Sequence, residues 1–207
     1  MPMKLYYSPG ACSLSPHIVL NEAHLPYELV RVDLKTKKME DGEDFLRVNP
    51  KGYVPVLGLD DGATLTEGPA IVQYLADLRP ETRLAPPAGT LERYRLQEWL
   101  NFISTEIHKQ FSPLFNPQTP EPMREAQKQR LGGRFDFVVS SLEGHDFLMP
   151  QGFTVADAYL YTVLTWSPSV GLSLDPWPKL RSYMERVQKR PGVSAALAKE
   201  REAKKAG

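Results

Sequence analysis

The chain has 207 residues, with 25 basic and 25 acidic side chains, 19 prolines and a single cysteine. This length is sufficient for one or two domains with a sizeable hydrophobic core. The zero formal net charge argues against nucleic acid as the main partner, because nucleic-acid binding needs clustered basic residues. One cysteine excludes an intramolecular disulfide framework and a cysteine-rich zinc site, and we expect no bound metal.

The apolar runs are too short to span a membrane, and the first ten residues, MPMKLYYSPG, lack the apolar core of a signal peptide. A lone cysteine is also typical of proteins kept in a reducing compartment. The sequence therefore predicts a globular protein of the cytoplasm that does not bind membranes.

The first 80 residues are predicted to form a small mixed sheet with helices packed on it. The expected elements, in chain order, are strand 3–7, helix 13–23, strand 27–34, strands 54–59 and 63–66, and helix 69–78. A strand, a helix and a second strand in succession imply a parallel pair with a right-handed crossover. The turn Asp60-Asp61-Gly62 is expected to join the later two strands into an antiparallel hairpin.

Residues 81–90 contain two prolines and several turn-forming residues, and they are predicted to be a linker. Beyond the linker, residues 91–207 carry the apolar spacing of helices. The expected helices span 91–111, 123–142, 154–166, 178–189 and 193–204, with Gly132-Gly133 interrupting the second. Thr154 and Asp157 have the spacing of a capping box at the start of the third helix, a feature that serves folding.

Cys12 follows the first strand and the turn Ser8-Pro9-Gly10, and it opens the first helix. Unpaired N–H groups at a helix start stabilise an anion, so a cysteine there is expected to have a lowered pKa. Its lone thiol could form a mixed disulfide with a small thiol, or stabilise the thiolate of another molecule. The alternative interpretation is a small, inert, buried side chain.

Two further segments point to a ligand. A cis bond between Val54 and Pro55 would turn the backbone groups of Val54 outward, where they could pair with a peptide-like ligand. Sequence alone, however, favours a trans bond. Glu67 and Gly68 open a helix, so a backbone N–H there could bind a carboxylate and Glu67 an ammonium group. Glutamate is also common in the first turn of any helix.

Four segments together resemble the cytosolic glutathione transferases. They are residues 6–13 (YYSPGACS), 49–55 (NPKGYVP), 66–71 (TEGPAI) and 153–157 (FTVAD). The cysteine after the first strand, with residues 99–103 (WLNFI) and His108-Lys109, looks like the bacterial beta class. The match covers essentially the whole chain. It implies an α/β thioredoxin-like N-terminal domain (βαβ-ββα) over 1–80 and an all-α C-terminal domain, in a homodimer.

The resemblance also implies a glutathione site. In the family the Val-Pro bond is cis, Val54 pairs with the cysteinyl backbone of glutathione, and Glu67 and the Gly68 N–H hold its γ-glutamyl end. Many members have serine where Gly68 stands, so only a backbone contact remains. The implied catalytic residues are Cys12 and His108. The implied glutathione-binding residues are Cys12, Tyr53, Val54, Pro55, Glu67, Gly68, Asn101, His108 and Lys109, and the second-substrate pocket is formed by Pro9, Phe111, Phe115 and Trp166.

Asn101 and His108 would lie two α-helical turns apart and face the same way. For His17, His24 and His145 we expect ordinary surface or capping positions.

The implied function is conjugation of glutathione, as co-substrate, to apolar electrophiles in detoxification. One alternative is a glutathione-dependent thiol-disulfide or peroxide reductase in which Cys12 forms a mixed disulfide. A second alternative is a non-catalytic protein that binds apolar ligands or glutathione.

Overall fold

The computed structural model describes residues 2–205, and the chain forms two compact units. Met1–Leu84 and Arg190–Gly207 make the first unit, and Ala85–Lys189 the second. The first boundary falls inside the predicted linker. The second boundary differs from the prediction, which placed all of residues 91–207 in the helical domain.

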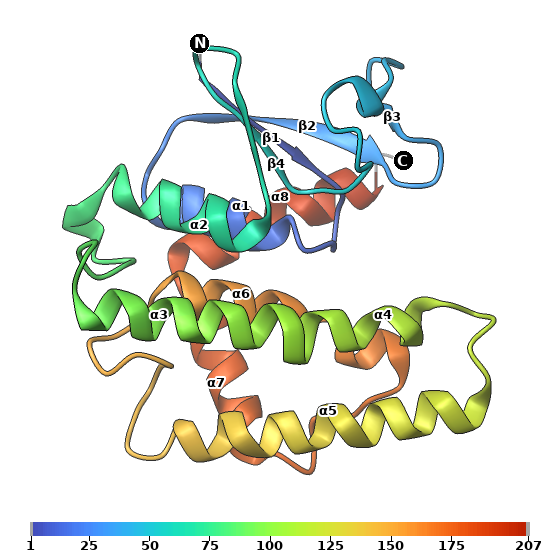
Figure 1. Ribbon diagram of the computed structural model, residues 1–207, viewed down its shortest axis with the longest axis vertical. Coiled ribbons are helices and arrows are strands. Elements are labelled where there is room, and N and C mark those ends of the chain that lie inside the picture. The colour runs from blue at the N-terminus through green and yellow to red at the C-terminus, as the bar shows by residue number, and fades with distance from the viewer. Residues whose placement is uncertain (1, 206–207) are drawn as a thin grey trace. The chain divides into compact units, whose positions relative to one another are not determined.

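The last helix belongs to the first unit, where α8 (Pro191–Lys205) packs along α1 (Leu14–Glu22) (Figure 1). Glu22 explains this placement. Its carboxylate accepts hydrogen bonds from Arg190 Nη2 at 2.5 Å and from Gly192 N at 3.1 Å. A Cβ atom on Gly192 would lie 2.6 Å from Glu22 Cγ, so glycine permits this close approach.

The first unit contains a five-stranded mixed sheet in the order β3-β2-β1-β4-β5. Its strands are β1 (Met3–Tyr7), β2 (Tyr27–Asp33), β3 (Lys38–Met39), β4 (Val56–Gly58) and β5 (Thr64–Thr66). The parallel β1–β2 pair and the antiparallel β4–β5 hairpin confirm the predicted topology. Among the strands of residues 2–205, only β3, a strand of 2 residues, was not predicted, because so short a strand shows no alternation.

Both faces of the sheet are packed. Figure 1 shows α1 and α2 (Gly68–Asp77) side by side against one face. Successive residues of a strand point to opposite faces, and in β1 Leu5 is fully buried while Tyr6 packs on Phe45 with ring centroids 5.9 Å apart. Phe45 begins the short 3₁₀ helix η1 (Phe45–Arg47) and belongs to a buried cluster that includes Val54. This cluster anchors the start of the Val54-Pro55 segment.

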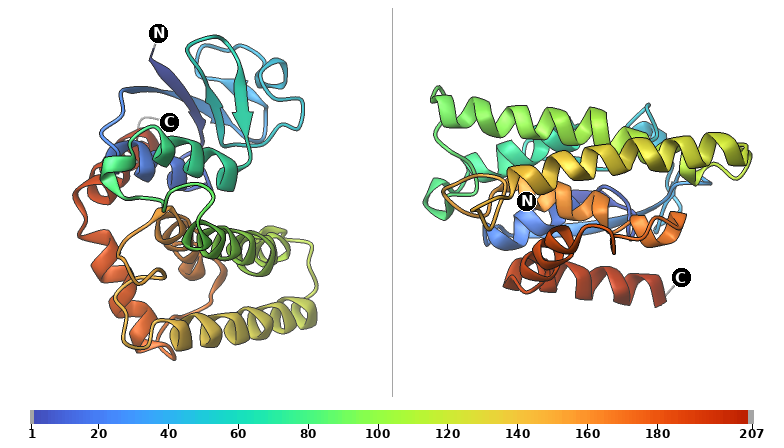
Figure 2. Two further views of the ribbon diagram at one scale, coloured as in Figure 1. Left: turned by 60° about the vertical axis from the view of Figure 1, so that its left-hand side comes forward. Right: turned by 90° about the horizontal axis from the view of Figure 1, so that it is seen from below.

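The second unit is all helical, as predicted. Its elements are α3 (Leu91–Phe102), the π-helix η3 (Ile103–His108), α4 (Lys109–Phe115), α5 (Glu121–Ser141), α6 (Val155–Leu164), the 3₁₀ helix η4 (Ser167–Val170) and α7 (Pro178–Gln188). Every residue of α6 is buried. Helix α5 packs along η3 and α4, and Figure 2 shows these helical segments side by side.

Two helices of this unit differ from expectation. The helix predicted to end at residue 111 continues through η3 to Phe115. Helix α5 is not interrupted at Gly132-Gly133. A Cβ atom on Gly132 would lie 3.3 Å from Trp177 Cζ2, so this glycine makes room for the indole. Within residues 2–205, no helix has both the length and the apolar character that a membrane span requires.

The predicted capping box at the start of α6 is confirmed. Asp157 Oδ2 accepts a hydrogen bond from Thr154 N at 2.9 Å, and Asp157 Oδ1 accepts from Leu148 N at 2.9 Å and Tyr183 Oη at 3.0 Å. Asp157 is fully buried, and burial raises the pKa of its carboxyl group to about 6, although these hydrogen bonds favour the charged form.

Replacing Asp157 by Asn should therefore lower the free energy of unfolding by about 1–3 kcal/mol, since an amide cannot accept hydrogen bonds at both positions. Urea denaturation measures the change. The matched control is Asp60→Asn in the exposed hairpin turn, which should change the free energy of unfolding by less than about 0.5 kcal/mol. Equal effects of the two variants would contradict the structural role of the buried carboxylate.

Candidate active site

Cys12 lies in the turn between β1 and α1, and local hydrogen bonds shape this turn. Gly10 has a φ of +81°, a conformation that glycine adopts without strain. Ser13 Oγ accepts from Ser8 N and donates to Ser8 O, both at 3.2 Å. Because Ser13 is fully buried, its hydroxyl group closes the turn and fixes the position of Cys12 just before α1.

The thiol of Cys12 donates a hydrogen bond to Val54 O, with Sγ and O 3.1 Å apart. Burial raises the pKa of this thiol to about 11, and the negative charge of Glu67 adds to the increase. Hydrogen bonds from the Cys12 and Ser13 backbone favour the thiolate but do not offset burial. The expectation of a lowered pKa was therefore wrong: Cys12 is a neutral thiol at pH 7, and it acts as a donor.

The Val54-Pro55 bond is cis, as the family resemblance implied and contrary to the expectation from sequence alone. The buried Asn49 holds the preceding loop, with its Nδ2 donating to Tyr53 O at 2.8 Å. Lys37 Nζ donates to Gly52 O at 2.9 Å. Sequence reasoning missed Lys37, since its contact depends on a loop closed across 15 residues.

Glu67 occupies the N-terminal end of α2, directly after β5. Its φ of +70° is strained for a residue other than glycine, and its carboxylate is 70% exposed and paired with Lys51. Helix α2 begins at Gly68 and has no side-chain cap, so its first N–H groups suit an anionic ligand. A Cβ atom on Gly68 would meet Pro55 Cγ at 3.9 Å, which places this helix start beside the cis proline.

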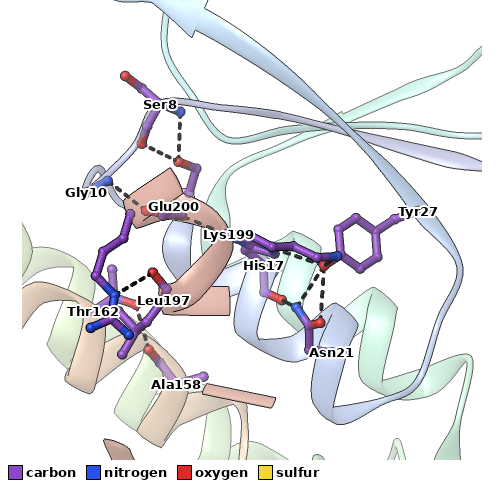
Figure 3. A network of polar contacts seen from close by, with 12 residues as sticks. Ser8, Gly10, His17, Asn21, Tyr27, Ala158, Thr162, Leu197, Lys199 and Glu200 are labelled. Atoms are coloured by element: carbon purple, nitrogen blue, oxygen red, sulfur yellow. Dashed lines mark hydrogen bonds and ion pairs between the residues drawn. The ribbon is translucent and has the colours of Figure 1, made fainter. Parts of the chain in front are cut away.

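A network of polar contacts that links α1, β2 and α8 supports the Cys12 turn (Figure 3). Glu200 of α8 accepts a hydrogen bond from Gly10 N through Oε2 at 2.7 Å, and its Oε1 lies 3.3 Å from His17 Nδ1. His17 Nε2 lies 3.0 Å from Tyr27 Oη, which also accepts from Lys199 Nζ at 2.9 Å. The network thus links the turn, α1, β2 and α8 into one body.

His17 is completely buried, so its expected surface position was wrong. The residues of α1 from Leu14 to Leu20 are all buried, and their spacing gives no sign of which partner meets the imidazole. That partner, Glu200, is 183 residues away in sequence. His24 and His145 are exposed, as expected.

His108, in the second unit, closes the π-helix η3. Its Nδ1 lies 2.6 Å from Tyr159 Oη, and its ring packs on Trp166 with centroids 4.9 Å apart. Burial and, to a smaller extent, the neighbouring positive charge of Lys109 lower the pKa of His108 to about 4. The imidazole is therefore neutral at pH 7.

The π-helix changes how His108 relates to Asn101. Its wider i→i+5 turn rotates the chain less per residue than an α-helix, so α-helical spacing alone does not set the relative directions of the two side chains. Asn101 and Lys109 are exposed, whereas His108 is partly buried against α6. That Asn101 and His108 face the same way stays a prediction.

Three of the four predicted pocket residues cluster in the second unit. Trp166 packs edge-on against Phe111 and Phe115, each with centroids 5.6 Å away. Phe111 is fully buried, whereas Phe115 is 50% exposed. Phe111 therefore forms the core beneath the other two rings. Pro9 lies in the Cys12 turn of the first unit and is partly exposed.

Comparisons with known proteins match both units of the chain to one family. The family model of the glutathione S-transferase N-terminal domain matches residues 10–78, and that of the C-terminal domain matches residues 102–191. The glutathione S-transferase GstA of Escherichia coli O157:H7 is 48% identical over 198 residues, which cover 96% of this chain and 98% of the relative.

Two solved structures share the fold over nearly the whole chain. A sphingomonad glutathione S-transferase in complex with glutathione is 47% identical, with a TM-score of 0.92 and coverage of 95% of this chain and 98% of the other. A bacterial beta class glutathione S-transferase of Sphingomonas chungbukensis is 46% identical, with a TM-score of 0.92 and the same coverage of 95% and 98%.

The raised pKa of Cys12 predicts slow alkylation by iodoacetamide. With a pKa of about 11, the thiolate fraction at pH 7.5 is about 300-fold below that of an ordinary cysteine of pKa about 8.5. Mass spectrometry follows the reaction directly, because Cys12 is the only cysteine. The rate should keep rising above pH 9, and the urea-unfolded chain is the control. A rate that levels off below pH 8 would contradict the assignment.

Proposed function

The chain belongs to the glutathione S-transferase family, within its bacterial beta class, and we propose that it joins the glutathione thiolate to the electrophilic carbon of apolar compounds. This proposal rests on three features that lie close together in the first unit. The Cys12 thiol, the cis Val54-Pro55 segment and the uncapped start of α2 at Gly68 lie together.

The binding mode follows from what each feature offers. The peptide-like backbone of glutathione pairs with Val54 as a short added strand. The α-carboxylate of its γ-glutamyl end binds at the Gly68 N–H, and the adjacent ammonium group pairs with Glu67. Without the ligand, Lys51 is paired with the Glu67 carboxylate, so the ammonium group of glutathione must displace Lys51. Tyr53 and Pro55 form the remaining contacts.

Cys12 acts on the bound thiolate as a hydrogen-bond donor. The glutathione thiol loses its proton to solvent, and its sulfur attacks the electrophilic carbon of the second substrate. A carbon–sulfur bond forms, and the leaving group departs with its electron pair. A neutral Cys12 S–H, once it turns from Val54 O toward the bound sulfur, stabilises the thiolate before attack. A thiol of pKa about 11 does not favour the alternative reductase function, because only the thiolate forms a mixed disulfide.

The second unit supplies the surface for the apolar substrate through the exposed ring of Phe115, against which the buried Trp166 packs. We assign His108 to the glutathione site as a neutral group. Asn101, Lys109 and Pro9 are assigned to the ligand sites by family resemblance. We place the enzyme in the cytoplasm, where glutathione keeps a lone cysteine reduced.

We also propose that the protein is a homodimer. An aromatic cluster joins α3 to α5: the ring of Phe137 lies 5.8 Å from Trp99 and 5.0 Å from Phe102. Phe137 is 51% exposed, and Tyr94 and Leu91 of α3 are 59% and 67% exposed. Exposed apolar side chains gathered on one surface are typical of protein interfaces, and a second copy of the chain is the partner expected here.

Conjugation is tested with glutathione and an aromatic halide, using the wild type, Cys12→Ser and Cys12→Ala. Serine retains a donor, so Cys12→Ser should keep most of the activity, whereas Cys12→Ala should lose about tenfold or more. Intact mass after incubation with oxidised glutathione should show no stable adduct. A stable adduct on Cys12 would favour the reductase function, and absence of glutathione binding in calorimetry would overturn the proposal.

The dimer is tested by Phe137→Glu, which should shift the protein from dimer to monomer in light scattering, because burying an unpaired charge at an interface is costly. Met123→Glu is the matched control, since Met123 lies on the same helix and is 58% exposed. A wild-type monomer, or dissociation caused equally by both variants, would contradict the proposed interface.

A further inference from the structure

Tyr159 makes the polar contact that distinguishes the two nitrogens of His108. Its Oη lies 2.6 Å from His108 Nδ1, and the two rings meet edge-on with centroids 5.7 Å apart. Tyr159 is only 3% exposed and sits in α6, whose every residue is buried. The tyrosine is therefore held rigidly, and it holds one side of the imidazole in turn.

The charge of the His108 ring determines which hydrogen bond it can form with Tyr159. Burial keeps His108 neutral at pH 7, and Lys109, the charged neighbour on its own segment, adds to the effect. Glu106, on the same segment, is paired with Arg134 of α5 at 2.6 Å. A neutral imidazole carries a proton on one nitrogen and a free electron pair on the other. The group that meets Nδ1 therefore decides which nitrogen is protonated.

A phenol and a neutral imidazole have a preferred direction of hydrogen bonding. The phenol hydroxyl, with a pKa near 10, is the stronger acid of the two, and the bare ring nitrogen is the stronger base. A short contact of 2.6 Å fits an O–H···N bond from tyrosine to histidine. The proton of the ring then resides on Nε2, the nitrogen opposite Tyr159.

We propose that Tyr159 is a positioning residue that fixes His108 as the Nε2–H tautomer, so that His108 serves as a neutral hydrogen-bond donor and not as a base. The catalytic consequence rests on the proposed function, whereas the tautomer does not. Within that function, Nε2–H would offer bound glutathione an uncharged hydrogen-bond donor in addition to the Cys12 thiol.

Long-range ¹H–¹⁵N NMR spectra of histidine-labelled protein test the tautomer directly. The wild type should show His108 as the Nε2–H form from pH 6 to 9, with the signal assigned by its loss in His108→Gln. Tyr159→Phe should give a mixture of both tautomers. Tyr161→Phe is the matched control, because Tyr161 lies on the same helix and is also 3% exposed, and it should leave the spectrum unchanged.

Kinetics then test the catalytic consequence. Tyr159→Phe should lower kcat for conjugation about tenfold while the KM for glutathione changes little, and Tyr161→Phe should change neither. An Nδ1–H tautomer in the wild type would overturn the proposal, as would a Tyr159→Phe spectrum identical to the wild type. The wild-type spectrum alone decides the tautomer if a variant fails to fold. Lack of any conjugation by the wild type would overturn the proposed function and leave the tautomer result standing.

Discussion

The hydrogen bond from the Cys12 thiol to the Val54 carbonyl joins two segments that are 42 residues apart, and the candidate glutathione site is organised around it. Separate sets of contacts hold each end of this bond. Ser13 closes the turn that carries Cys12, while Asn49 fixes the loop that leads to Val54. The bond therefore joins two rigid supports, and the thiol points toward the backbone group expected to bind the ligand.

Burial sets the protonation states in both units. It raises the pKa of Cys12 to about 11 and that of Asp157 to about 6, and it lowers the pKa of His108 to about 4. Cys12 and His108 are consequently uncharged hydrogen-bond donors at pH 7. Neutral donors can stabilise an incoming thiolate without a permanent positive charge that would also hold other anions.

Patterns of residues within one segment predicted most of the fold. The parallel pair at β1, the hairpin and the capping box at Thr154 all depend on neighbours in sequence, and all are present. The features that were missed depend on distant partners. The burial of His17 requires Glu200, 183 residues away, and the π-helix that ends at His108 has no sequence signal of its own. The proposed site residues Cys12, Val54 and Glu67 were predicted because motifs carried them, whereas Tyr159 belongs to no motif.

The carboxylate of Glu200 has a consequence for the order in which the protein is built. It accepts a hydrogen bond from Gly10, which lies 190 residues earlier. A ribosome moves from the N-terminus at about 5–20 residues per second, so β1 and its turn leave the exit tunnel well before α8 is made. During that interval the turn lacks its acceptor, and α1 exposes the surface that α8 later covers. The loop that carries Cys12 is among the first parts of the molecule to be synthesised and among the last to be finished.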